Sequence, residues 1–149
     1  MAQQMNQFKP SVELGQIALE AIEGRTLQVR IDPSYSGTGV KNGDVVKLVS
    51  TSEGADILVT PKSSGTDKSL GIVAYTFKKT TFGAGNYCEV YVGGKIVFGK
   101  IGEAVNAGDE LTWDATNGFM KASGGSAVDA IALDKSGIGT GRVIIKGII

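Results

Sequence analysis

The residue types available for chemistry are restricted, because the chain of 149 residues contains no histidine and only one cysteine. Without histidine there is no imidazole base, so Ser-His-Asp and Cys-His nucleophile systems and histidine metal sites are excluded. A single cysteine supports neither a disulfide framework nor a cysteine-rich zinc site. We therefore expect a binding or structural protein and not an enzyme.

Carboxylates are the remaining groups with acid-base potential. Catalysis of the glycosidase type needs two carboxyl groups that converge in a cleft. Asp129 with Asp134 and Glu20 with Glu23 are candidate pairs, but such dispersed acids are typical of solvated strand faces and turns. The chain also lacks the alternating acids of a calcium loop. We predict no catalytic residue and no metal site.

Glycine-rich segments are the candidates for phosphate binding. Residues 94–100 match the first seven positions of a P-loop, but the eighth is Ile101, which has no hydroxyl for Mg²⁺. This match lies within a predicted β-ribbon and not at a strand-to-helix turn. Residues 37–39 and 137–141 form no complete dinucleotide fingerprint, and neither opens a helix. We expect a strand with glycine at either end in the first case, flexible loops in the others, and no cofactor.

Two further side chains have functional alternatives. In the segment 87–92, alternation places Cys88, Val90 and Val92 on one face, so the thiol is expected in the core and not as a nucleophile. Trp113 is a candidate sugar platform, although a single tryptophan in a strand is more typical of a core or an interface.

Charge and hydropathy limit the classes of binding partner that we expect. Lysine plus arginine and aspartate plus glutamate number 15 each, so no basic footprint for nucleic acid is present. No stretch approaches 18 apolar residues, and the polar first ten residues do not form a signal peptide. We expect no nucleic acid and no membrane partner, and synthesis in a reducing cytoplasm. Zero net charge also favours assembly over a highly soluble monomer.

Short β-type segments dominate from residue 25 onward, each bounded by Gly, Asn, Asp or Ser. Tight two-residue turns are expected at Gly93-Gly94 and Asn117-Gly118, where positive φ costs little. Many short strands at this spacing predict a barrel or sandwich. The ten expected strands are 26–31, 44–50, 56–60, 70–76, 87–92, 95–100, 110–114, 119–122, 128–133 and 142–148.

The first 24 residues differ from the rest. Residues 1–10 lack periodicity and carry isolated apolar residues, which is typical of an extended arm that orders on a partner. Residues 11–24 place apolar side chains at helical spacing, with Ser11 as a cap and Gly24 as an end, although a docked extended segment carries the same pattern. We therefore divide the chain into residues 1–24, an arm with a possible short helix, and 25–149, a β-barrel domain.

Two longer-range patterns remain. Asn42-Gly43-Asp44 and Ala107-Gly108-Asp109 each open a strand that is followed by three more; duplication and coincidence of a common turn both explain this. The chain also ends on apolar residues, 143–149, where tails are normally polar. Either the last strand is central to the core or it packs against a neighbour.

The order of these β segments resembles the capsid decoration (cement, or head-stabilisation) proteins of tailed bacteriophages. The resemblance covers residues 42–149, and its motifs are structural. They are GDVV at 43–46, GIVA at 71–74, EVYVGG at 89–94, AGDELT at 107–112, AIAL at 130–133 and RVII at 142–145.

The resemblance implies a mainly β fold, a small β-barrel or β-tulip-like body, in a homotrimer. It implies a virion protein on the outer surface of the capsid that binds the major capsid protein and stabilises the expanded head by bridging its subunits. An N-terminal arm would lie along the capsid protein, and by position its contacts would be Met5, Phe8, Pro10, Val12 and Leu14.

Two other functions stay open. One is a β-rich module that recognises glycans or cell surfaces, with Trp113 or Tyr91 as its platform. The other is an enzyme that uses carboxylates alone, which requires two acids that are each essential for turnover.

Overall fold

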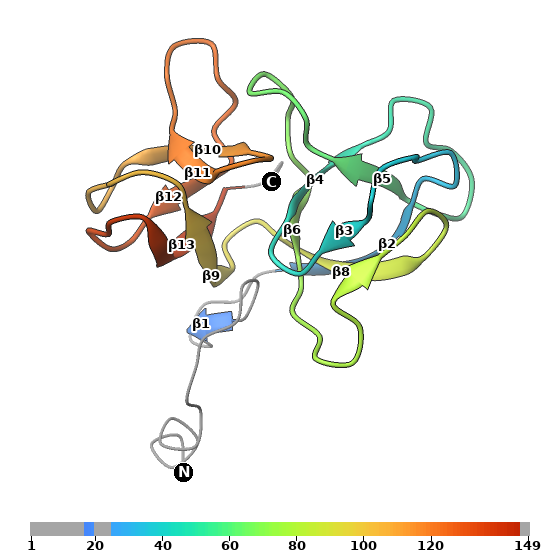
Figure 1. Cartoon of the computed structure of the whole chain (residues 1–149). Helices are drawn as coiled ribbons and strands as arrows, with labels where there is room; N and C mark the ends of the chain where they lie inside the picture. Colours follow the sequence, from blue (N-terminus) through green and yellow to red (C-terminus); the bar gives the residue numbers. More distant parts are fainter. Residues whose placement is uncertain (1–16, 20–24, 147–149) are drawn as a thin grey trace.

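The computed structural model describes residues 17–19 and 25–146, and these residues form thirteen strands and no helix (Figure 1). The strands are β1 (Ile17–Leu19), β2 (Arg25–Ile31), β3 (Val40–Lys41), β4 (Val45–Leu48), β5 (Leu58–Pro61), β6 (Gly71–Val73), β7 (Thr81–Phe82), β8 (Tyr87–Val92), β9 (Ile96–Ile101), β10 (Glu110–Asp114), β11 (Gly118–Lys121), β12 (Ala130–Ala132) and β13 (Gly139–Ile145). The prediction of a mainly β fold built on a small barrel is confirmed.

The first half of the body is a closed barrel in the order β2-β5-β4-β6-β8. β2 pairs in parallel with β5, and every other pairing in the ring is antiparallel. The alternation predicted for β8 is present, because Cys88, Val90 and Val92 are all buried. They join a core that includes Val29, Ile31, Val59 and Val73.

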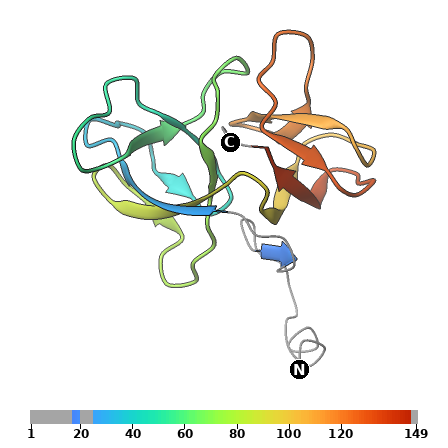
Figure 2. The same ribbon diagram turned by 180° about the vertical axis from the view of Figure 1, so that it is seen from behind.

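The second half repeats this arrangement in the order β9-β11-β10-β12-β13, and β13 pairs back onto β9. Here β9 pairs in parallel with β11, again with antiparallel pairing elsewhere. Trp113 and Phe119 pack edge to face in its core, with ring centroids 5.0 Å apart. Figures 1 and 2 show the two halves side by side.

The two rings have the same topology, strand for strand. In chain order, β2, β4, β5, β6 and β8 correspond to β9, β10, β11, β12 and β13, with the same neighbours and directions. The small β3–β7 pairing, Val40 with Phe82, corresponds to the bridge between Val105 and Ser136. We conclude that the repeated strand order reflects a duplicated unit.

The glycine-aspartate turns match in detail. The Lys41 amide donates to Asp44 Oδ2 at 2.9 Å, and the Asn106 amide donates to Asp109 Oδ2 at 2.8 Å. The glycines between them have φ values of 86° at Gly43 and 92° at Gly108. A short side chain that accepts from the backbone, next to a residue able to adopt positive φ, is what this turn requires.

Every one of the ten expected strands overlaps an observed strand, and three were missed. Two of these, β3 and β7, have two residues each, which is too short for a periodic signal. The third, β1, lies where we expected a helix. There Ile17 and Leu19 pair with Val97 and Ile96 of β9, so for these residues the helix prediction is wrong and the alternative, a docked extended segment, is confirmed. Pairing with the edge of β9 replaces the helical hydrogen bonds that the spacing predicted.

The structure differs from the prediction at both expected two-residue turns, Gly93-Gly94 and Asn117-Gly118. Gly93 and Gly94 both have positive φ, but they connect two different rings and do not close a hairpin. β10 and β11 do form a hairpin, in which Asp114 pairs with Gly118 across three loop residues. In this hairpin only Gly118 adopts positive φ, at 97°.

The last described strand is central to the core. β13 lies between β12 and β9, and Val143 and Ile145 are buried. This confirms the first of the two alternatives for the apolar C-terminal segment as far as residue 146. The expected division at residue 24 falls in the range 20–24, outside the described residues, and stays a prediction.

Candidate functional site: a buried polar seam between the barrels

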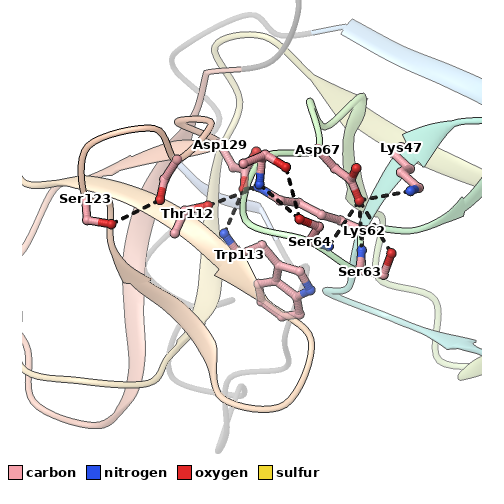
Figure 3. Close-up of polar contacts among 11 residues, drawn as sticks. Lys47, Lys62, Ser63, Ser64, Asp67, Thr112, Trp113, Ser123 and Asp129 are labelled. Carbon is pink, nitrogen blue, oxygen red and sulfur yellow. Dashed lines mark hydrogen bonds and ion pairs between the residues drawn. The ribbon is translucent and has the colours of Figure 1, made fainter.

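The most unusual polar group in the described chain is a buried lysine that crosses from one barrel to the other (Figure 3). Lys62 directly follows β5, and its Nζ donates to Asp129 Oδ2 at 2.5 Å and to Thr112 Oγ1 at 3.0 Å. The side chains of Lys62 and Asp129 are 0 % and 1 % exposed. We call Lys62, Thr112, Asp129 and the Trp113 amide the polar seam.

Backbone pairing places both charges. The Lys62 amide donates to Val45 O, and the Asp129 amide donates to Leu111 O. The Trp113 amide donates to Asp129 Oδ2 at 2.7 Å. Asp129 Oδ1 is buried and has no hydrogen-bond partner among the described residues. One carboxylate oxygen therefore accepts both from the ammonium and from a backbone amide, while the other accepts from neither.

Neither charge has a counterpart in the other copy of the repeat. After β5 the Lys62 amide donates to Val45 O, and at the equivalent position after β11 the Ala122 amide donates to Glu110 O. Before β12 the Asp129 amide donates to Leu111 O, and at the equivalent position before β6 the Leu70 amide donates to Val46 O. Lys62 and Asp129 thus stand where the other barrel has Ala122 and Leu70. The pair is specific to the contact between the two barrels.

A second ion pair supports the loop that follows Lys62. Asp67 accepts from Lys47 Nζ at 2.9 Å and from the Ser64 amide at 3.1 Å. The hydrogen bond from Lys47 lowers the pKa of Asp67 below its usual value. Asp67 therefore ties the loop that follows Lys62 to β4, and Figure 3 shows these contacts.

The polar seam connects the two barrels. The Lys62 ammonium and the Asp129 carboxylate neutralise each other in the interior. The described residues contain no group of three or more His, Cys, Asp or Glu side chains that could hold a metal ion. Both charges lose their hydration when they are buried, and this cost offsets much of their attraction. The pair therefore contributes little to net stability, and its main effect is to specify which residues of the two barrels meet. We therefore interpret the seam as a structural contact.

The two described candidate acids, Asp129 and Asp134, pair with different basic residues. Asp129 lies in the seam, so the expectation of a solvated carboxylate is wrong for this residue. Asp134 forms a two-pronged pair with Arg142, at 2.8 Å from Nε and 2.7 Å from Nη2. The Arg142 hydrogen bond lowers the pKa of Asp134. Glu20 and Glu23 lie outside the described residues.

The other sequence candidates have structural roles. Trp113 is 6 % exposed, so its ring is not available as a sugar platform, and Tyr91 is partly buried, with Lys95 Nζ 5.4 Å from its ring centroid. Burial raises the pKa of the Cys88 thiol to about 11, with a smaller contribution from Glu89.

The glycine-rich candidates are strand and loop. Residues 96–101 of the P-loop-like match are strand β9, as expected. Gly99 lies under Phe119, since a Cβ there would be 2.8 Å from Phe119 Cε2. Residues 139–141 begin β13 and are not a flexible loop, whereas 37–39 precede β3 as a loop.

The five predicted arm contacts, Met5, Phe8, Pro10, Val12 and Leu14, lie outside the described residues. The polar seam was missed from the sequence because Lys62 and Asp129 are 67 positions apart, and nothing in their local patterns marks either as buried. Among the described residues, no helix is long and apolar enough to cross a membrane.

Comparison with known proteins gives a similarity of fold to a solved structure. No protein-family model matches the chain, and no curated protein matches it. Among solved structures, the chain is similar to the N base of the head fiber gp8.5 in bacteriophage phi29, with a TM-score of 0.56 and 14% sequence identity. The match covers 83% of this chain and 95% of that chain. The two proteins therefore share a fold over nearly the whole length of the head fiber base.

Proposed function

We propose that this protein is a structural virion protein of a tailed bacteriophage, attached to the outer surface of the head. The observation that carries the proposal is the fold similarity to a phage head fiber base, which covers 95% of that chain. The resemblance of the β segments in residues 42–149 to decoration proteins points to the same location.

In finer detail, the protein binds the major capsid protein and stabilises the expanded shell by bridging neighbouring subunits. Such a role requires main-chain pairing and dispersed apolar contact, and no reactive group. An extended arm supplies this by adding a strand to a partner sheet. Many copies on one lattice add avidity, so each contact can be weak. The arm residues assigned to this contact are Met5, Phe8, Pro10, Val12 and Leu14.

The body supports this role as a preassembled unit. The two barrels contribute to one core cluster, in which Val45 and Ile72 of the first pack with residues of the second. The polar seam adds a buried ion pair across the same contact. We therefore expect both barrels together to carry a load applied between two bound capsid subunits.

The test is co-sedimentation of the purified protein with expanded, undecorated phage heads. The full chain is expected to sediment with heads, and a chain lacking residues 1–10 is expected to stay in the supernatant while it retains the far-UV circular dichroism of the full chain. A matched control replaces Ile138, which is 80% exposed on the body, with serine and is expected to bind.

The two failures are distinguishable. If the truncated chain binds heads as well as the full chain, the arm assignment is wrong and the body carries the contact. If the full chain does not bind heads of its own phage at all, the head-surface function is wrong.

A further inference from the structure

The duplicated barrels present two equivalent strand edges that are filled differently. In the second barrel, β9 pairs with β13 from Ile96 to Ile101 on one side. On its other side β11 reaches only Ile101, and β1 pairs with Ile96 and Val97. The chain's own N-terminal strand therefore pairs with the first two residues of the stretch of β9 that the ring leaves open.

The equivalent part of β2 is not covered in the same way. β2 pairs with β8 from Arg25 to Arg30, while on the opposite side β5 reaches only Arg30 and Ile31. No strand among the residues that the structure describes pairs with positions 26–29 on that side. We call this stretch the β2 edge.

The backbone direction along the β2 edge follows from its neighbours. The Arg30 amide donates to Ile57 O on the β5 side, and the Ile31 amide donates to Asn86 O on the β8 side. Because successive residues of a strand point their backbone groups to opposite sides, Thr26 and Gln28 direct theirs to the uncovered side. Both side chains are exposed.

The β2 edge also lacks the usual protection against pairing. Natural edge strands carry proline, lysine or an inward charge that discourages a further strand. Residues 26–29 read Thr-Leu-Gln-Val, with neither proline nor charge. Such an edge is a ready acceptor for an extended segment.

We infer that the β2 edge binds residues 12–14 of a second copy of this chain. The equivalent edge takes Ile17-Ala18-Leu19, and residues 12–14, Val-Glu-Leu, repeat its pattern of a β-branched residue, one intervening residue and leucine. Only Gly15 and Gln16 separate residues 12–14 from β1, which is held on β9 in the other barrel. For this reason we assign the strand on the β2 edge to a neighbouring copy. A head-to-tail exchange of this kind closes into a ring, which is compatible with a homotrimer.

This inference goes beyond the proposed function, because it concerns contacts between copies and is tested without heads. It changes one part of that proposal: Val12 and Leu14 are reassigned from the capsid contact to the neighbouring subunit, and Met5, Phe8 and Pro10 keep the capsid contact.

The first test is amide hydrogen exchange in the full chain, followed residue by residue by NMR. The Thr26 and Gln28 amides are expected to exchange slowly in the full chain and at least tenfold faster in a chain lacking residues 1–16. The amides of Leu27 and Val29, which point to β8, serve as internal controls and stay slow in both. Fast exchange of Thr26 and Gln28 in the full chain would show an uncovered edge and overturn the inference.

The second test identifies the occupant by light scattering. Gln28→Pro removes an N–H that points away from β8, so it breaks no hydrogen bond to that strand. It is expected to convert an oligomer to a monomer, whereas Gln28→Ala leaves the oligomer intact. Where Gln28→Pro fails to fold, Val12→Pro in the arm is expected to give the same monomer.

Three outcomes exclude a second copy. A monomeric full chain with slow Thr26 and Gln28 amides means that its own arm occupies the edge. If the Thr26 and Gln28 amides become protected only after heads are added, the capsid protein occupies the edge. Unchanged oligomeric mass in both proline variants means that the copies associate elsewhere.

Discussion

At the scale of single residues, the polar seam explains how two barrels of the same topology are held in one arrangement. Apolar contacts between the barrels are not directional, whereas Lys62 Nζ meets two acceptors at once, at 2.5 and 3.0 Å. A shifted contact would leave a charge buried and unpaired, which is strongly unfavourable. We interpret the seam as a device that selects one relative position of the barrels.

Lys62→Ala is expected to reduce the free energy of unfolding by about 3–5 kcal/mol, because Asp129 is left as an unpaired buried charge. The double variant Lys62→Met with Asp129→Asn is expected to recover most of this loss, since the new amide side chain is uncharged and keeps an acceptor for the Trp113 amide. Urea denaturation measures both. A double variant as unstable as Lys62→Ala would show that the charge pair itself supplies stability.

Cys88 gives a prediction about pH. Burial raises its pKa from the ordinary 9.0 to about 11, so the folded state favours the neutral thiol. This contribution is fully present below pH 9 and is lost as the pH rises toward 11, because the unfolded chain gives up its proton first. The stability of the wild-type chain is expected to fall relative to Cys88→Ala over this range, in parallel urea titrations. A constant difference would contradict it.

At the scale of elements, the glycine-aspartate turns are the most regular feature of the duplication. Gly108 has φ near 92°, and a Cβ there would meet nothing within 4 Å. Any cost of substitution at this position therefore comes from the backbone and not from a clash.

Gly108→Ala is expected to cost about 1–2 kcal/mol in unfolding free energy, the usual penalty for a non-glycine residue in the left-handed region. Gly124→Ala is the matched control, since it also has open space but no positive φ. It is expected to be neutral or slightly stabilising. Equal effects in thermal denaturation would mean that backbone strain is not what selects glycine at 108.

Strands were more predictable than their pairing. Alternation along residues 87–92 identified both the strand and its buried face, because period-2 burial is a local property. The pairing of strands, in contrast, does not depend on local sequence. The glycine pair at 93–94 indicated a hairpin, yet β8 and β9 belong to different rings. β1 shows the same limit, since its strand conformation depends on the edge of β9.

At the scale of the whole molecule, the two barrels are expected to unfold together. Residues of both contribute to one core cluster, and the polar seam crosses the contact. Cys88 lies in the first barrel and Trp113 in the second, so the chain carries one natural probe in each.

Urea midpoints from Cys88 thiol labelling and from Trp113 fluorescence are expected to coincide, as in a two-state transition. In Lys62→Ala both midpoints are expected to fall together. Separate midpoints in the wild-type chain would show that the barrels are independent domains.

The sequence alone determined the class of the fold, ten of its strands, the burial of Cys88 and the lack of histidine-based chemistry. Composition, alternation and turn residues act over a few positions, so they can be recognised without knowledge of the fold. Tertiary structure decided that the repeat is a duplicated barrel, that Lys62 and Asp129 meet in the interior, and that β1 pairs with the edge of β9. These depend on contacts between residues tens of positions apart, and no local pattern encodes which distant groups will meet.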